Sequence, residues 1–379
     1  MKKTLLWIVL AAVCFSAIYL IRIREDMVDF RVNYKAGERL RNGEDLYPTA
    51  DGHFMFKYLP SSALLYVPFS YLPLEGAKAA WYSLTVVCSL FLFYMSYKMV
   101  GSGEQRSALW MIWPPLILAK FFFREMKLGQ INTIVTALML MMIWYLMDER
   151  KKSNQEALPG VFWGLATALK PYALIFFPYF IVKRNWRSLA VGLIVIGAAL
   201  FAPSAYYGVE GNLQLHRDWA STLSQSTPSL FNSADNVSII GFLTKWTGDQ
   251  GMSFWVYLFA VAALAFLVLA LIVKGRQTEN AAVLEGAILL VSIPLVSPMG
   301  WDYSLLMSVV GVSLLVAHFF DFAKFWRVVL VVNFSLISLT VYDLIGRQLY
   351  GTFMMWSVLT VSFLVVLGYL AVLRFRNLA

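Results

Sequence analysis

The chain has 379 residues, of which 60% are hydrophobic and only 14% are charged, and its mean hydropathy is +0.67. A soluble domain carries roughly a quarter charged residues, so this chain has too few to cover a water-facing surface. It contains repeated apolar runs of about 16 to 24 residues, long enough to span a bilayer core. These runs are continuous rather than alternating, which excludes an outer-membrane barrel. The composition therefore predicts an all-α polytopic membrane protein and excludes a soluble enzyme, a nucleic-acid reader and a disordered hub.

The net charge of +9 arises from 31 Lys and Arg against 22 Asp and Glu. In a membrane protein this excess is typical of positive flanks that fix topology, together with a site for an anionic headgroup. Membrane lipids are therefore expected partners, and nucleic acid is not. Cys14 and Cys88 both lie in apolar runs, which predicts neither a disulfide nor a metal site.

The first apolar run, residues 4–21, follows Lys2 and Lys3. It predicts an uncleaved first membrane helix with a cytoplasmic N-terminus. Residues 22–58 then form the first extracytoplasmic loop. The following apolar stretch, residues 59–72, contains Pro60 and Pro68, and Pro73 comes directly after it. Prolines at this density favour an interfacial or re-entrant helix over a full span.

A second interrupted segment is residues 158–182, with Lys170 and Pro171 at its middle. A single crossing would place the next basic residues outside, against the positive-inside rule. Two half-helices that turn at Lys170 keep every later loop consistent, with residues 204–250 as a long extracytoplasmic loop. The other predicted spans are 77–100, 107–123, 131–147, 188–203, 253–273, 281–296, 303–318, 328–341 and 352–373. We expect about twelve membrane helices in one domain, residues 1–379, with both termini cytoplasmic.

The first loop contains an amphipathic segment, in which Phe30, Tyr34, Gly37 and Leu40 fall on one helical face. Such a helix is suited to the membrane interface. Asp29 stands at its start. Two interpretations are open: Asp29 caps the helix, or it presents a carboxylate to a lipid headgroup at the membrane surface.

Several short motifs occur in a fixed order along the chain. Residues 29–34 read Asp-Phe-Arg-Val-Asn-Tyr, 43–47 read Gly-Glu-Asp-Leu-Tyr, and 56–60 read Phe-Lys-Tyr-Leu-Pro. Residues 128–132 (Leu-Gly-Gln-Ile-Asn), 164–172 (Gly-Leu-Ala-Thr-Ala-Leu-Lys-Pro-Tyr), 235–238 (Asp-Asn-Val-Ser) and 297–302 (Ser-Pro-Met-Gly-Trp-Asp) follow. This succession resembles that of glycosyltransferase family 87, within the GT-C superfamily of polyprenol-phosphate-sugar-dependent enzymes. Two residues depart from the family pattern: Leu59 replaces an expected Pro, and Tyr303 stands where many members carry His.

The resemblance implies a GT-C-type fold with interfacial helices in the first extracytoplasmic loop. It also implies transfer of a hexose, with mannose expected, from a polyprenyl-phosphate donor to a hydroxyl of a glycan or glycolipid acceptor. The reaction would occur on the extracytoplasmic face of the plasma membrane, with inversion. The phosphate leaves as a stable anion, so the site requires one base and cations for the phosphate. The alternatives are a polyprenyl-phosphate arabinofuranosyltransferase, a lipid or sugar transporter or flippase, and a non-catalytic membrane partner.

The candidate residues follow from the matched positions and from chemistry. Asp29 is the predicted catalytic base. Donor-phosphate ligands are predicted at Lys170, Arg124, Lys127 and Lys57; Lys170 is also open to snorkelling, and the others to interfacial anchoring. Sugar or acceptor contacts are predicted at Gln130, Asn132, Asn236, Trp301, Asp302 and Tyr303. Helix caps are the alternative for Gln130, Asn132 and Asp302, and packing for Trp301. Asn236 also begins a glycosylation sequon, residues 236–238. Tryptophans at 219 and 301 are candidates for stacking on a sugar ring.

An acidic cluster, Glu25, Asp26 and Asp29, has the ligand chemistry of a hard divalent cation. A solvated acidic run is the alternative, and we expect neither a metal nor another cofactor.

Overall fold

The computed structural model describes residues 12–101, 111–147, 155–274 and 281–376. The regular elements of this part of the chain are all helices, and its only β-type pairing is an isolated bridge between Asn236 and Trp301. The prediction of an all-α protein is therefore confirmed. Positions 2, 3, 150–152 and 276, where basic residues guided the predicted topology, lie outside the described residues.

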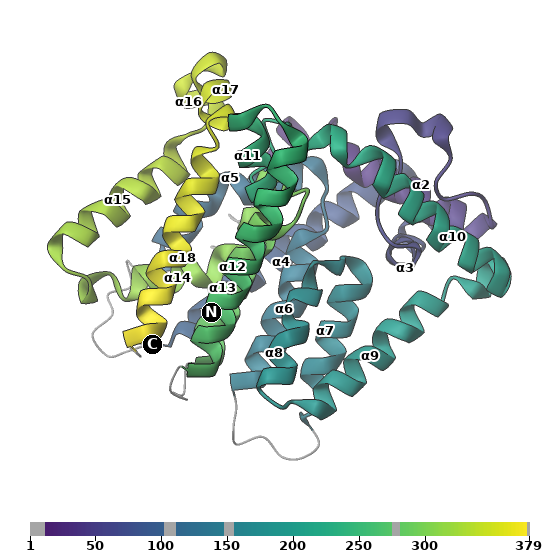
Figure 1. Cartoon of the computed structure of the whole chain (residues 1–379). Helices are drawn as coiled ribbons and strands as arrows, with labels where there is room; N and C mark the ends of the chain where they lie inside the picture. The colour runs from purple at the N-terminus through teal and green to yellow at the C-terminus, as the bar shows by residue number, and fades with distance from the viewer. Residues whose placement is uncertain (1–11, 102–110, 148–154, 275–280, 377–379) are drawn as a thin grey trace, which may run out of the picture.

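Most of the longer helices form a bundle (Figure 1). They are α4 (Leu74–Val100), α5 (Trp113–Leu128), α6 (Asn132–Met147), α7 (Leu158–Leu169), α9 (Trp186–Phe201), α12 (Gln250–Lys274), α13 (Ala281–Val296), α15 (Lys324–Leu339) and α18 (Val358–Arg376). Shorter elements join them: α8 (Phe177–Val182), α14 (Val309–Ala317), α16 (Tyr342–Ile345) and α17 (Arg347–Met355). In Figure 1, α11 (Ile239–Thr247), α16 and α17 lie at the upper edge, and the C-terminus lies at the lower edge.

Among the described helices, α4, the 250–273 part of α12, and α18 are long and apolar enough to cross a membrane. A fourth span results if α9 and the helix after it, bent by 92°, count as one. Six apolar helices are shorter: Ala12–Ile23, Asn132–Met147, Leu158–Leu169, Pro171–Val182, Ala281–Val296 and Asp302–Ala317. These helices support an integral membrane protein. The number of about twelve membrane helices stays a prediction.

The segment predicted to be interrupted by prolines contains three short helices. They are α3 (Pro60–Ala63), η3 (Leu64–Tyr66) and η4 (Phe69–Tyr71). Pro60 is the first residue of α3, where its missing N–H costs nothing. The prediction that this stretch forms no single span is confirmed. These short helices pack against α2 (Val28–Asn42), the amphipathic helix of the first loop.

The turn predicted at Lys170 is confirmed. The helix α7 ends at Leu169, Lys170 is extended (φ −143°, ψ 123°), and η7 (Pro171–Phe176) and α8 follow. A residue before proline disfavours the α conformation, which explains why the helix stops there. The α7 helix lies very close to α9, because a Cβ on Gly160 would stand 2.0 Å from the Ser188 carbonyl oxygen. Small residues at such a contact are typical of membrane helix packing.

The long loop predicted for residues 204–250 is largely helical. It contains α10 (Ser204–Ser226), kinked at Gly208, then η8 (Pro228–Leu230) and α11. α10 extends beside α2 and α3 in Figure 1 and contacts both. This helix brings Trp219 and Thr227 to the same end of the bundle as the first loop.

Candidate active site

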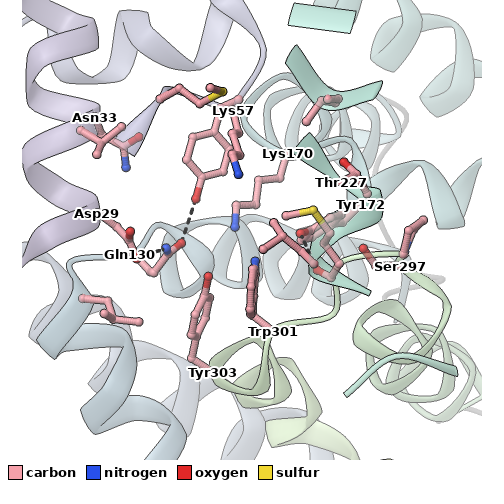
Figure 2. Close-up of a pocket in the computed structure, with 18 of the residues that line it drawn as sticks. Asp29, Asn33, Lys57, Gln130, Lys170, Tyr172, Thr227, Ser297, Trp301 and Tyr303 are labelled. Atoms are coloured by element: carbon pink, nitrogen blue, oxygen red, sulfur yellow. Dashed lines mark hydrogen bonds between the residues drawn. The ribbon is translucent and has the colours of Figure 1, made fainter. Parts of the chain in front are cut away.

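A cavity of about 530 Å³ lies where the first loop, the α5–α6 turn, the Lys170 turn and the loop after α13 meet. Seven of the predicted site residues line it: Asp29, Lys57, Arg124, Gln130, Lys170, Trp301 and Tyr303. Residues from four separate regions of the sequence therefore share one cavity (Figure 2). The other four predicted residues, Lys127, Asn132, Asn236 and Asp302, do not line it.

Asp29 lies in the first turn of α2 but does not cap it. The cap position is taken by Met27, which is left-handed (φ 53°), and no side chain bonds to the helix N-terminus. Asp29 Oδ2 instead accepts a hydrogen bond of 2.6 Å from Gln130 Nε2, and Gln130 Oε1 accepts one of 2.8 Å from the Tyr58 hydroxyl. Figure 2 shows Asp29 and Gln130 side by side at the cavity, with hydrogen bonds as dashed lines. The capping interpretation of Asp29 is therefore wrong.

The environment of Asp29 favours the neutral acid more than water does. Burial raises the pKa of its carboxyl, against the opposing effects of the Gln130 hydrogen bond and the Lys170 charge. A base is most effective when its pKa lies close to the working pH. A carboxylate with a raised pKa at the wall of a cavity has the properties of a general base.

The turn after α5 fixes α2 in place. Gly129 is left-handed (φ 71°), and a Cβ there would stand 2.5 Å from the Phe30 Cβ, so only glycine fits. The backbone N–H of Met27 donates to the Lys127 carbonyl at 2.8 Å. Phe30 then stacks on Trp81 with ring centroids 5.4 Å apart. The glycine in the Leu-Gly-Gln motif thus lets the first loop dock directly beside Gln130.

Lys170 is 3% exposed. Its ammonium donates to Asn132 Oδ1 at 2.8 Å and lies 4.8 Å from the ring centre of Tyr58 and 5.2 Å from that of Tyr172. Within the described residues, no carboxylate lies within ion-pair distance of it. A buried lysine that lines a cavity is not snorkelling to an interface, so that alternative is wrong. The aromatic faces and the amide oxygen leave this cation able to accept an anionic partner.

Lys57 approaches the same space from the first loop. Figure 2 shows the amines of Lys57 and Lys170 extending into one region of the cavity, with Trp301 and Tyr303 facing it. Burial lowers the pKa of Lys57, and the Asp29 charge opposes that effect. The Trp219 indole donates to the Lys57 carbonyl at 3.2 Å, which links α10 to the first loop. Two ammonium groups therefore converge opposite one carboxylate.

Arg124 contacts the cavity wall but is already paired. Its guanidinium lies 2.6 Å from the Asp235 carboxylate and 2.7 Å from that of Asp302. The same two loops also pair through their backbones, with Val237 N donating to Gly300 O at 2.6 Å. Arg124 thus holds the wall together. With two carboxylates already bound, it has less capacity for phosphate than Lys170 has.

The four predicted residues outside the cavity lining make other contacts. Lys127 is about half exposed and lies 3.5 Å from Asp26. Asn236 is buried and donates to the Pro298 carbonyl at 3.1 Å, which fixes the loop rather than a ligand. Asp302 bonds to Arg124 behind the wall. Asn132 is fully buried between Lys170 and a carboxylate of α5.

That carboxylate, Glu125, is a polar residue that the sequence analysis missed. It is completely buried and accepts hydrogen bonds from Asn132 Nδ2 at 2.8 Å and from Thr133 N at 3.0 Å. Glu125 lies between Arg124 and Lys127, after the predicted span 107–123, so its local sequence resembles an ordinary polar turn and gave no signal. Among the described residues, no group of three His, Cys, Asp or Glu side chains is arranged to hold a metal ion.

Comparisons with known proteins show the family of the chain. The model of glycosyltransferase family 87 matches residues 56–298, well over half of the chain. The chain belongs to this family, and the resemblance noted from the motifs is confirmed.

A curated relative is the alpha-(1->3)-arabinofuranosyltransferase of Corynebacterium glutamicum, 26% identical over 290 residues. The match covers 73% of this chain but only 64% of that protein, so the chain spans less than two thirds of its relative. Among solved structures, ArnT from Cupriavidus metallidurans bound to undecaprenyl phosphate is similar, with a TM-score of 0.43, 12% identity, and coverage of 97% of this chain and 77% of ArnT. Its apo form gives a TM-score of 0.41 and 15% identity, with coverage of 98% and 78%.

Proposed function

We propose that the protein is a membrane glycosyltransferase that moves a sugar from a polyprenyl-phosphate donor to an acceptor hydroxyl. Family membership supports the reaction class. The observation that carries the proposal is that Asp29 and two ammonium groups, those of Lys57 and Lys170, face one cavity. Such a cavity offers a base for the acceptor and positive charge for a phosphate, which are the two requirements of this transfer.

In the proposed reaction, Asp29 takes the proton of the acceptor hydroxyl as its oxygen attacks the anomeric carbon. The bond from that carbon to the phosphate oxygen breaks, and its electron pair leaves with the phosphate. Lys170 and Lys57 stabilise the charge that develops there. Because one displacement occurs, the anomeric configuration inverts. The bundle exposes many large apolar side chains. In the proposed complex the polyprenyl tail lies against these side chains or in the surrounding lipid.

Two donor sugars are candidates. The motifs led to the expectation of a hexose, mannose in particular, but no comparison supports mannose. The corynebacterial relative is named as an arabinofuranosyltransferase, which favours the alternative donor, a polyprenyl-phosphate arabinofuranose. We therefore place arabinofuranose ahead of mannose. The proposed acceptor is a glycan or glycolipid on the extracytoplasmic side.

The test supplies purified protein in lipid nanodiscs with a membrane glycan and glycolipid fraction as acceptor and short-chain polyprenyl-phosphate arabinofuranose or mannose as donor, and measures release of the polyprenyl phosphate. We expect consumption of one donor, and the preferred sugar decides between the two candidates. Lys170→Met should raise the donor KM by roughly 10- to 100-fold, as loss of a charged hydrogen bond implies.

Lys120→Met is the matched control, because Lys120 donates to the Thr340 carbonyl at 3.0 Å and does not line the cavity. Consumption of neither donor, or an unchanged donor KM in Lys170→Met, would contradict the proposal.

The side of the membrane is tested separately. In a background without Cys14 and Cys88, single cysteines at Asn42 and Met299 are labelled with an impermeant maleimide in intact cells. Both should react, since both positions belong to the end of the bundle that holds the cavity. Protection of either cysteine until the cells are opened would contradict the proposed extracytoplasmic site.

A further inference from the structure

Glu125 lies directly behind the wall that carries Lys170. Its side chain is completely buried and does not line the cavity. An ionised carboxylate is costly to bury unless hydrogen bonds and an opposite charge compensate it. Two hydrogen bonds are present, from Asn132 Nδ2 and from Thr133 N at the start of α6. The cation that acts on Glu125 is Lys170.

Asn132 connects Glu125 to Lys170. Its Nδ2 donates to Glu125 Oε2 at 2.8 Å, and its Oδ1 accepts from Lys170 Nζ at 2.8 Å. An amide has a donating end and an accepting end, so the Glu125 carboxylate fixes which end faces Lys170. This hydrogen bond holds the Lys170 ammonium at one position on the cavity wall. The Lys170 backbone is extended there, before Pro171.

Few charges face Lys170. The carboxylates that act on it are Glu125 from α5 and Asp29 from α2. Arg124 is next to Glu125 in sequence but is bound to Asp235 and Asp302. The other titratable side chains that line the cavity are His53, Lys57, Tyr58, Tyr172 and Tyr303.

The two carboxylates differ in the reaction. Asp29 faces the cavity, and as the proposed base it becomes neutral when it takes the acceptor proton. From that moment it no longer offsets the charge of Lys170. Glu125 does not line the cavity, so it does not exchange a proton with the acceptor. Its interaction with Lys170 therefore does not end when the acceptor is deprotonated.

We propose that Glu125 is a positioning residue that, through Asn132, fixes the Lys170 ammonium and keeps it protonated for the donor phosphate. This inference rests on the proposed function, in which Lys170 binds that phosphate. Glu125 touches no substrate and acts only through Lys170. Removing its charge should therefore change how donor binding depends on pH, beyond any change in folding.

The experiment measures binding of farnesyl phosphate to the purified protein from about pH 7 to pH 10, where the phosphate stays doubly charged. Glu125→Gln keeps the size and an oxygen for Asn132 but removes the charge. An opposite charge nearby favours a charged group, so without it Lys170 should lose its proton at lower pH. The pH at which affinity is half lost should fall by about one unit or more, while affinity near pH 7 stays within about threefold of wild type.

The matched control is Glu285→Gln. Glu285 is also completely buried, but it lies on α13, is paired with Lys183 and Arg374, and does not line the cavity. Its substitution should lower thermal stability without moving the pH profile of binding. An unshifted profile in Glu125→Gln, or an equal shift in both variants, overturns the inference.

A double substitution keeps the test decisive if Glu125→Gln folds poorly. Lys170→Met alone leaves the Glu125 carboxylate buried without its counter-charge, so the melting temperature should fall. Adding Glu125→Gln should restore part of that loss, and additive losses would contradict the coupling. If Lys170→Met leaves farnesyl phosphate affinity unchanged, the donor-site assignment itself is wrong. If Lys170→Met lowers the affinity but Glu125→Gln leaves the pH profile of binding unchanged, the role of Glu125 is wrong and the donor-site assignment stands.

Discussion

Two buried carboxylates show how differently the two ends of the bundle use charge. Glu285, on α13, is bound by Arg374 at 2.6 Å and Lys183 at 2.9 Å, near the end where α18 terminates at the lower edge of Figure 1. Glu125 reaches its cation only through Asn132. The first arrangement is a closed ion pair that joins helices. The second leaves Lys170 with unused capacity beside a cavity, which is what anion binding requires.

The comparison predicts that cavity substitutions change turnover and lower-end substitutions change stability. Asp29→Asn gives the largest expected effect. It keeps the shape and can still bond to Gln130, so melting temperature should stay close to wild type. Proton acceptance is lost, and turnover should fall by roughly 100- to 10,000-fold.

Asp26→Asn is the control for Asp29→Asn, because Asp26 is partly exposed and pairs only weakly, at 3.5 Å, with Lys127. The pH profile sharpens the test. Because the pKa of Asp29 is raised, its carboxylate should take up a proton at a pH above the ordinary aspartate value of about 3.9. Wild-type turnover should therefore decline as pH falls through that range. This decline should be absent from the residual turnover of Asp29→Asn. Near-normal turnover in that variant would place the base elsewhere.

Glu285→Gln should show the opposite pattern. Breaking a buried ion pair by removing one partner typically costs about 3 to 5 kcal/mol of unfolding free energy. We expect a lower melting temperature in detergent, with the donor KM of the folded fraction unchanged. A raised donor KM in Glu285→Gln at unchanged stability would show that Glu285 also affects donor binding. The distinction between the two ends of the bundle would then be wrong.

Lys57→Met should have an intermediate effect. Lys57 faces the cavity but is less buried than Lys170, so we expect a rise in donor KM of roughly tenfold, less than for Lys170→Met. Lys127→Met, an exposed lysine outside the cavity, should leave the donor KM unchanged. A larger rise in donor KM for Lys127→Met than for Lys57→Met would instead support the prediction that Lys127 binds the donor phosphate.

The smallest expected effect concerns the ion pairs of Asp51 with Arg39 and Lys35 in the first loop. Arg39 lowers the pKa of Asp51 to about 2. The stabilisation is therefore complete above about pH 4 and is lost as pH falls toward 2. Asp51→Asn should cost about 1 to 2 kcal/mol at neutral pH. The difference in melting temperature from wild type should shrink below about pH 4; a constant difference would refute this origin.

Much of the fold could be predicted where prolines or charged residues interrupt an apolar run. A lysine and a proline inside an apolar run favour a break in the helix, and a turn is present at Lys170. The proline-rich stretch after residue 59 was readable for the same reason. The helix α10 was not, because its polar sequence is stabilised by packing on α2 and α3 rather than by periodicity. The prediction of a long loop there was therefore incomplete.

The site was predictable in its outward-facing residues and not in their supports. Asp29, Lys57 and Lys170 share the cavity as their motif positions suggested. Asn132 was predicted to bind sugar, yet the i to i+2 spacing from Gln130 turns it away from the cavity and toward Glu125. The partners of Arg124 come from residues more than 100 positions away, and no local pattern indicates such pairing.

The chain of hydrogen bonds from Tyr58 through Gln130 to Asp29 also has a direction. The phenol donates to the amide oxygen, and the amide nitrogen donates to Asp29 Oδ2. An amide cannot donate from both ends, so Oδ2 is reserved as an acceptor before any substrate arrives. In the proposed reaction the two oxygens of the Asp29 carboxylate therefore have different roles. One is anchored to the protein, and the other, Oδ1, is the atom left to receive the proton.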